Sequence, residues 1–341
     1  MAKAKKLPSG SWRARAYSHT TPDGKKHYES FTASTKQEAE MLAAKFSNSR
    51  SSYNIFDLTV SAAIDKYIES KTNVLSPSTI RGYRQVQGKY FDSIGNMKVK
   101  KLTSADIQFF ISDLATKLSP KTVKNIYGLL TASIALFAPD IHFRVTLPMK
   151  EKKLNESPSE SDVMALYDSA QEWLKKCIAL GAFGGLRRGE ISALKFKDIQ
   201  NNSIYIHADF VLDEYNVWHY KPMPKTVKSV RTVKLPSRVI ELLGTGSPDA
   251  YVVGVMPDKI TKGFYRLKKN HKIDIRFHDL RHYYASIGSI LGIPDFIMAD
   301  FGGWEHDSKS LKQSYQGNIK SITDGYSKKL NDHFDTLIEN V

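Results

Sequence analysis

The chain has 341 residues, of which 25% are charged, and its formal net charge at pH 7 is +15. This length exceeds one ordinary compact domain and fits two or three. The charge indicates a polyanionic partner, with nucleic acid first. No run approaches the roughly eighteen apolar residues of a spanning helix, and the basic N-terminus lacks the apolar stretch of a signal peptide. We therefore expect a cytoplasmic protein with no membrane partner.

The positive charge is concentrated toward the N-terminus. Residues 1–55 hold ten Lys and Arg against four Asp and Glu, residues 56–154 hold fifteen against eight, and the remainder holds twenty-five against twenty-three. A front part that binds DNA and a nearly neutral back part that carries the chemistry is the simplest division. The single cysteine, Cys177, lies in an apolar run, so we expect a core residue rather than a nucleophile.

The first 55 residues predict a small three-stranded sheet with one helix. Segments 11–19 and 27–32 alternate like strands around a turn at Asp23-Gly24, and Thr35 with Glu38 forms a capping box for a helix to about residue 47. The basic residues that we expect to contact DNA from this sheet are Arg13, Arg15, Lys25 and Lys26. The alternative is a solvated sheet with ordinary surface charges.

Residues 56–150 predict four helices. The first runs from about residue 60 to 70, and the other three begin at Ser76-Pro77, at Thr103 with Asp106, and at Ser119-Pro120. The basic residues that we expect to face DNA here include Arg81, Arg84, Lys121 and Lys124. The charged outer surface of an ordinary helical bundle is the alternative. A boundary follows at about residues 147–158.

The last part, residues 158–341, predicts a mixed but mostly helical domain. A helix follows Ser159, an apolar helical run covers 173–195, and segments 203–210, 216–221 and 231–235 resemble strands. Helices follow, including one at about 281–291. The fold class is therefore α+β, mainly α, with a small antiparallel sheet in this domain.

Two segments place arginines in apolar surroundings, where an unpaired charge is unfavourable. In GLRRGEISAL, residues 185–194, Arg187 lies in an apolar run, where charge is costly unless used or paired. Glu190 could hold its guanidinium from the same helical face, and a plain ion pair is the alternative. In FHDLRHYY, residues 277–284, His278 and Arg281 share a helical face, a pair that suits phosphate.

The second segment also has a zinc interpretation, which we consider weak. His278 and His282 are spaced as in the H-E-x-x-H pattern. Asp279 stands where the longer glutamate is needed, Arg281 would set a cation beside the metal, and no third ligand stands out. We therefore expect no metal.

Two further segments add candidate groups. In FGGWEHDSKSLKQSYQG, residues 301–317, paired glycines make a tight turn, Trp304 and His306 offer ring N–H donors, and Tyr315 follows on a short helix. Between the two arginine segments, Lys225 follows Pro224 in a hairpin-like stretch. On its own such a lysine is usually solvated surface.

Taken in order, these residues resemble the catalytic set of the tyrosine recombinases, enzymes that cut and rejoin DNA. The set is Arg187, Lys225, His278, Arg281, Trp304 and Tyr315. The resemblance covers residues 158–341 as a catalytic domain with a C-terminal tail helix, and more loosely residues 56–150 as a core-binding domain. Residues 1–55 resemble the arm-type DNA-binding domain of phage and conjugative-transposon integrases.

The resemblance and the needs of the reaction give each residue a role. Tyr315 attacks the phosphodiester, Arg187 and Arg281 meet the charge that develops, and Lys225 protonates the leaving 5′ oxygen. His278 manages the tyrosine proton or holds a phosphate oxygen, and Trp304 adds a hydrogen bond and packing. No cofactor is needed, because arginines supply the electrostatics and the phosphotyrosine keeps the bond energy for rejoining.

Two assignments stay open. Trp304 precedes Tyr315 by eleven residues, somewhat more than is common in the family, whereas His306 precedes it by nine, so either ring could fill the position. We favour Trp304, because it follows the paired glycines. Tyr326 is a rival nucleophile.

The resemblance implies an integrase of a mobile element, a prophage or conjugative transposon, working as a homotetramer on double-stranded DNA with core and arm attachment sites. The implied location is the nucleoid of a bacterial host cell, and an excisionase and a DNA-bending protein are possible partners. The alternatives are a resolvase of chromosome or plasmid dimers, a type IB topoisomerase, and a catalytically silent DNA-binding regulator.

The C-terminal segment carries an apolar stripe on one helical face, formed by Leu330, Phe334, Leu337, Ile338 and Val341. It would pack either on its own domain or, as the resemblance implies, on a neighbouring protomer.

Overall fold

The computed structural model describes residues 3–20, 26–49, 58–150, 157–222, 229–314 and residue 331. Its chain forms two compact units, Met1–Thr72 with Tyr83–Lys150, and Asn73–Gly82 with Glu151–Val341. No helix in the described ranges is long and apolar enough to cross a membrane. The tail stripe lies outside the described residues, as do the Asp23-Gly24 turn and Lys25.

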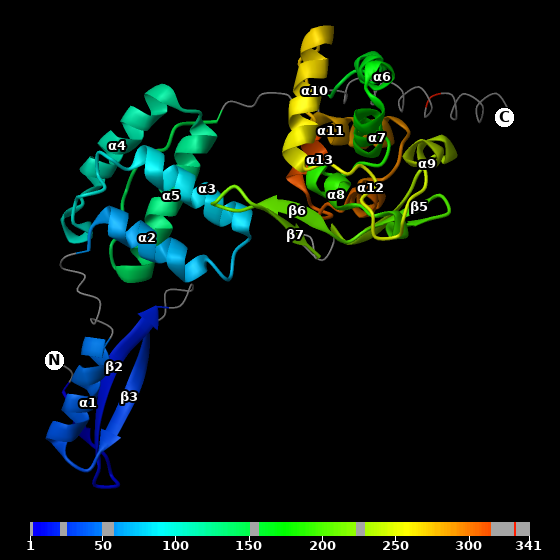
Figure 1. Cartoon of the computed structure of the whole chain (residues 1–341). Helices are drawn as coiled ribbons and strands as arrows, with labels where there is room; N and C mark the ends of the chain where they lie inside the picture. Colours follow the sequence, from blue (N-terminus) through cyan, green and yellow to red (C-terminus); the bar gives the residue numbers. More distant parts are fainter. Residues whose placement is uncertain are drawn as a thin grey trace. The chain divides into compact units, whose positions relative to one another are not determined.

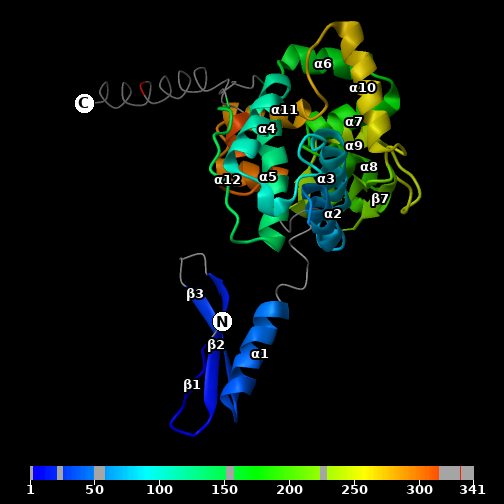
Figure 2. The same cartoon turned by 90° about the vertical axis from the view of Figure 1, so that its left-hand side faces the viewer.

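The N-terminal part is an antiparallel sheet in the order β1-β2-β3, covered on one face by a helix (Figure 2). The elements are β1 (Lys5–Lys6), β2 (Trp12–Thr20), β3 (Lys26–Ala33) and α1 (Lys36–Ser49). Ala14 and Ala16 face inward and pack on Ala39 and Ala43 of α1. These short side chains let the helix lie close to the sheet, and the predicted three-stranded sheet with one helix is confirmed.

The helical part contains the four predicted helices, α2 (Val60–Lys71), α3 (Pro77–Tyr90), α4 (Ser104–Lys117) and α5 (Pro120–Phe137) (Figure 1). Thr103 and Asp106 form the predicted reciprocal cap, since the Asp106 carboxylate accepts from the Thr103 N–H at 2.9 Å and Thr103 Oγ1 accepts from the Asp106 N–H at 3.2 Å. Ser119 Oγ accepts from the Thr122 N–H at 3.3 Å, with Pro120 in the first turn. Local capping therefore sets these boundaries, as expected.

The last part is mixed and mostly helical, as predicted. Its elements are α6 (Glu160–Ser169), α7 (Glu172–Ala182), α8 (Arg188–Ala193), β4 (Ile199–Gln200), β5 (Ser203–Ile206), β6 (Asp209–Leu212), β7 (Trp218–Lys221), β8 (Arg231–Lys234), α9 (Ser237–Leu243), α10 (Pro257–His271), α11 (Asp279–Ile290), α12 (Asp295–Gly302) and α13 (Lys309–Ser314). One antiparallel sheet has the order β4-β5-β8, and β6 pairs with β7 in a separate hairpin.

Two predicted elements are each divided in two. The apolar run 173–195 is not one helix, because α7 ends at Ala182 and Gly185 takes a left-handed φ of 66°, which lets the Leu186 N–H turn back to the Leu180 carbonyl at 3.1 Å. The segment 203–210 is not one strand either. It leaves the sheet after β5 at His207, whose ring bonds to Asp198 at 3.1 Å, and then starts the hairpin as β6.

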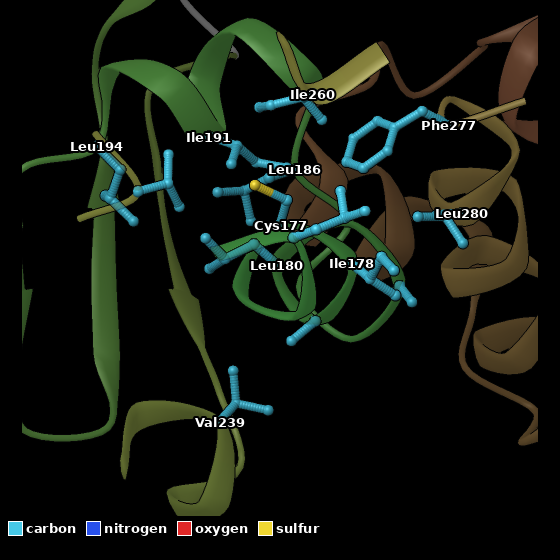
Figure 3. Packing of buried hydrophobic residues seen from close by; sticks show 14 of the residues in the cluster. Cys177, Ile178, Leu180, Leu186, Ile191, Leu194, Val239, Ile260, Phe277 and Leu280 are labelled. Atoms are coloured by element: carbon cyan, nitrogen blue, oxygen red, sulfur yellow. The ribbon is translucent and has the colours of Figure 1, made fainter. Parts of the chain in front are cut away.

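The core of this domain is built around α7 (Figure 3). Cys177, Ile178 and Leu180 of α7 pack with Leu186, Ile191 and Leu194, with Ile260 of α10, and with Phe277 and Leu280 beside and in α11. Burial raises the pKa of Cys177 to about 12, so the thiol is a core group, as predicted. Because α8 and α11 both rest on this core, the residues at their N-terminal ends are held in fixed positions.

Candidate active site

Arg187 and Glu190 form the first turn of α8. Glu190 caps this helix by accepting from the Arg187 N–H at 2.9 Å, and its other oxygen accepts from Arg187 Nη1 at 2.6 Å. The predicted pairing of the two residues is therefore present, but as a cap rather than along a helical face. The Glu190 side chain is 1% exposed.

A residue that we did not single out from the sequence completes this ion pair. Arg231 of β8 is buried and donates to both Glu190 oxygens, at 3.2 Å from Nη1 and 3.0 Å from Nη2. Burial alone would raise the pKa of Glu190, but Arg231 and Arg187 together lower it to about 2. The available signal was the alternation of β8, which puts Arg231 on the core side with Val233.

The other end of Arg187 contacts two further loops. Its Nη2 donates to the Gly303 carbonyl at 3.1 Å, and its Nη1 lies 3.5 Å from Ser229 Oγ. The side chain is nevertheless 34% exposed. Arg187 is thus held in one orientation while part of its guanidinium remains open to a ligand.

Arg281 is the most buried cation of the site, at 2% exposure. Its Nη1 donates to the Gly185 carbonyl, and its guanidinium stacks on the Trp304 ring, 3.8 Å from the ring centroid. Within the described part of the chain, its Nη2 is buried and has no hydrogen-bond partner. Burial, and then the neighbouring Arg187, lower the pKa of Arg281, so an anion here would relieve two unfavourable effects at once.

His278 immediately precedes α11. Its ring meets that of His282 edge to face, with centroids 5.0 Å apart. Burial, followed by His282 and Arg281, lowers the pKa of His278 to about 4. The imidazole is therefore neutral at physiological pH, so it can accept a proton or a hydrogen bond there.

Trp304 and His306, the two candidates for one position, lie in different surroundings. Trp304 is buried and stacked on Arg281, and its backbone N–H, not the indole N–H, donates to the Ala299 carbonyl at 2.8 Å. The His306 ring is half exposed and bonds to Asp300 at 2.9 Å. Trp304 is thus the ring in contact with Arg281, and its role stays a prediction.

Lys225, Tyr315 and Tyr326 lie outside the described residues. Tyr315 follows Ser314, the last residue of α13, in the sequence. Leu311 of α13 is buried in a cluster with Trp304. The described part of α13 is thus fixed against the same side chain that stacks on Arg281.

The zinc interpretation gains no support from the geometry around Asp279. Both Asp279 oxygens are engaged by Arg276, at 2.7 Å from Nη2 and 2.7 Å from the backbone N–H. The carboxylate is therefore not available to activate a water. In the described ranges, no group of three or more His, Cys, Asp or Glu could hold a metal ion.

The predicted DNA-contacting residues that the structure describes lie on four elements. Arg15 and Lys26 are exposed on β2 and β3, and Arg13 is partly buried on β2. Lys121 and Lys124 are exposed on α5, and Arg81 and Arg84 are partly buried on α3, where Arg84 pairs with Asp65 at 2.6 Å. Their contacts with DNA remain predictions.

Replacing Glu190 with glutamine should destabilise the protein. The amide cannot balance the buried Arg231 charge, and a hydrogen bond to a charged group contributes about 1.5–3 kcal/mol. We expect the free energy of unfolding in urea at pH 7 to fall by about that amount. Glu241→Gln on the exposed surface of α9 is the matched control and should leave it unchanged. Equal stability of the two variants would contradict the structural role of Glu190.

Comparison with known proteins shows what the chain is similar to. Residues 59–115 match the family model described as phage integrase, N-terminal SAM-like domain. The integrase of Staphylococcus phage L54a is 25% identical over 229 residues, which are 58% of this chain and 65% of that protein. A tyrosine recombinase XerC-like protein of Caldanaerobacter subterraneus is 27% identical over 254 residues, 65% of this chain and 64% of that protein. The chain spans just under two thirds of the length of these curated relatives.

The fold agrees with the sequence relatives. The Tn1549 transposon integrase, solved in complex with a circular intermediate DNA, superposes with a TM-score of 0.63 at 16% identity, over 76% of this chain and 95% of that chain. The protein therefore has the fold of the tyrosine recombinase integrases. The resemblance to this class is thus confirmed by relatives in sequence and in fold, whereas the roles of the six candidate catalytic residues stay predictions.

Proposed function

We propose that this protein is the integrase of a mobile element, a site-specific recombinase that cleaves and rejoins double-stranded DNA through a 3′-phosphotyrosine intermediate. The observation that carries the proposal is the buried Arg281, whose Nη2 has no partner among the described residues, next to the partly open Arg187. Two preorganised guanidinium groups with a neutral histidine suit a phosphodiester that gains charge during the reaction.

In this reaction the Tyr315 hydroxyl attacks the phosphorus and the bond to the 5′ oxygen breaks. Arg187 and Arg281 stabilise the charge on the non-bridging oxygens, and Trp304 holds the Arg281 guanidinium in one plane by stacking. His278 is neutral at physiological pH, so it can take the tyrosine proton. Lys225 supplies a proton to the leaving oxygen. A returning 5′ hydroxyl reverses these steps and rejoins the strand.

Two observations support a mobile element and DNA as the partner. The related L54a protein is a phage integrase, and the similarly folded Tn1549 protein was solved with DNA. The N-terminal sheet exposes Arg15 and Lys26 on the part of the chain that we propose binds arm sites. The working assembly is a homotetramer, because exchange between two duplexes cuts four strands with one tyrosine each.

The protein acts in the cytoplasm at the host nucleoid. The further proposed partners are an excisionase and a DNA-bending protein.

A resolvase of chromosome or plasmid dimers is the second candidate, favoured by the XerC-like relative. A resolvase uses the same chemistry, but this function does not explain the presence of the N-terminal sheet.

The direct test is a suicide-substrate assay. A duplex made from the DNA flanking the gene is nicked near the presumed cleavage point, so that the short fragment diffuses away and cleaved protein stays attached. We expect an adduct that resists denaturant and forms equally well in EDTA. Absence of an adduct on every flanking duplex, or loss of activity in EDTA with recovery on adding zinc, would contradict the proposal.

Removal of residues 1–55 should separate cleavage from recombination. Without the arm-binding part, cleavage of a short core site should be unchanged, whereas recombination of a full attachment site should fall at least about tenfold, because the second DNA contact no longer raises the local concentration of the catalytic part. Full-length protein carrying Arg13→Gln and Arg15→Gln is the matched variant and should show the same selective loss. Equal recombination by all three proteins would limit this part to a role in folding.

A further inference from the structure

A cavity beside Arg187 contains a carboxylate that the reaction does not use. Asp209, the first residue of β6, lines this cavity together with Arg187, Arg188 and His278. Its cross-strand partner in the hairpin is Lys221. Two of the residues proposed to act on the scissile phosphate, Arg187 and His278, therefore line the same cavity as a negative side chain.

The position of this carboxylate is built into the fold. Gly189 lies in the first turn of α8, and a Cβ at this residue would overlap the Asp209 Oδ1 atom and come within 2.8 Å of the Phe210 carbonyl oxygen. The Asp209 carboxyl group is thus packed against the backbone of Gly189, the residue between Arg188 and Glu190. Only glycine at this position lets β6 approach α8 so closely.

The charges that face Asp209 come from each element packed against it. The strongest are Arg187 before α8, Arg188 and Glu190 in α8, and Lys221 in β7. The same cavity is also lined by Arg81 of α3 and by Arg276 and His278 before α11. Burial, and then Glu190, raise the pKa of Asp209 to about 6, against the lowering effect of Arg187, Arg188 and Lys221. Glu190 is already satisfied by Arg231 and Arg187, so it does not share a proton with Asp209 by a direct bond.

Arg188 is the second group held within this cavity. Its Nη1 donates to the Thr261 hydroxyl of α10. Burial lowers the pKa of Arg188, while Asp209 and Asp258 raise it. In the protein without DNA, Asp209 is therefore part of the negative charge that balances the tandem arginines.

We propose that Asp209 is a positioning residue that balances Arg187 and Arg188 in the free protein and takes up one proton from solvent when a tetrahedral oxyanion enters the cavity. The identification of that oxyanion as the scissile phosphate of DNA rests on the proposed function. No bond other than the new O–H forms, and protonated Asp209 no longer repels the anion.

The sign of the linkage follows from the two charge states. An anion next to the carboxylate raises its pKa, because two adjacent negative charges in a partly buried site are unfavourable. Below the pKa of about 6 in the free protein, Asp209 is already protonated and the affinity for the anion is independent of pH. Above the pKa of Asp209 in the free protein, the affinity for the anion falls by up to about tenfold per pH unit, until the pH exceeds the pKa of Asp209 in the bound form.

Isothermal titration of the full chain with sulfate tests this without DNA. Sulfate keeps its charge between pH 5.5 and 8, so any proton taken up on binding is taken up by the protein. Repeating the titration in buffers of different ionisation enthalpy gives the number of these protons. At pH 7 the wild type should take up between about 0.5 and one proton per sulfate, and its affinity should fall several-fold from pH 6 to pH 8. Asp209→Asn should take up none, bind with a flat pH profile and bind more tightly than wild type at pH 8.

Two controls locate the proton. Asp258→Asn removes the other carboxylate that acts on Arg188 and should keep the wild-type proton uptake. His278→Asn should also keep the uptake, whatever its affinity, which excludes the neighbouring imidazole as the acceptor. Gly189→Ala, which displaces the carboxyl group, should reduce the uptake and provides a second variant if Asp209→Asn does not fold.

The proposal fails if wild type takes up no proton, if Asp209→Asn still takes one up, or if the wild type does not bind sulfate. None of these measurements involves Tyr315 or a cleaved strand. A protein that forms no adduct on DNA can therefore still show the linkage, and a protein that forms one can lack it, so the two proposals fail separately.

Discussion

Replacing Tyr315 with phenylalanine should abolish covalent attachment to DNA and leave the affinity for a core site within about twofold. The substitution removes one hydroxyl, which is the nucleophile, and a single neutral hydroxyl contributes little to an affinity that many phosphate contacts determine. Denaturing gels of the suicide-substrate reaction measure the first quantity, and gel shifts at fixed salt measure the second.

Tyr326→Phe is the matched control, because it removes the same atom from the rival tyrosine in the same segment. It should form adduct at the wild-type rate. If the Tyr315→Phe protein still forms an adduct and the Tyr326→Phe protein does not, the nucleophile has been assigned to the wrong residue.

Replacing Arg281 with alanine should slow cleavage by on the order of a hundredfold or more, the effect expected for removing a preorganised donor to a developing negative charge. The loss should appear in the rate at saturating protein, because the donor acts most strongly in the transition state. Arg281→Lys should recover little, since an ammonium group cannot both reach the Gly185 carbonyl and stack flat on Trp304.

The control for this effect is Arg238→Ala, which removes an exposed arginine from α9 and should leave the cleavage rate unchanged. Thermal unfolding of each variant separates a chemical loss from a folding loss. A folded Arg281→Ala protein that cleaves within about threefold of the wild-type rate would contradict the role of Arg281.

The parts of the fold that the sequence predicted correctly are those set by local chemistry. Thr103 with Asp106 and Ser119-Pro120 fixed helix starts, and alternation around Ala14 and Ala16 identified the N-terminal sheet. The errors arose where an apolar run crosses a chain reversal. The segment after Ala182 continues the apolar pattern of the helix before it. The chain turns there instead, because Gly185 adopts a left-handed conformation, and the Gly185 carbonyl accepts a hydrogen bond from Arg281.

The candidate site was only partly predictable for the same reason. Arg187, His278 and Arg281 could be found, because charge within apolar segments needs a ligand or partner. Arg231 and Asp209 acquire their roles from strands that pack onto α8, and the spacing of residues along the chain does not encode such contacts. The need for glycine at position 189 likewise becomes apparent only from the packing of β6 on α8.

The central claim, that the protein acts through a tyrosine bound to a 3′ phosphate, is tested most directly by mapping the trapped adduct. The wild-type protein is trapped on the suicide duplex, digested with a protease and a nuclease, and its peptides are weighed by mass spectrometry. We predict one peptide that contains Tyr315 and carries a nucleotide remnant joined through the 3′ phosphate. A remnant on Tyr326 or on any other residue, or one joined through a 5′ phosphate, would contradict the account.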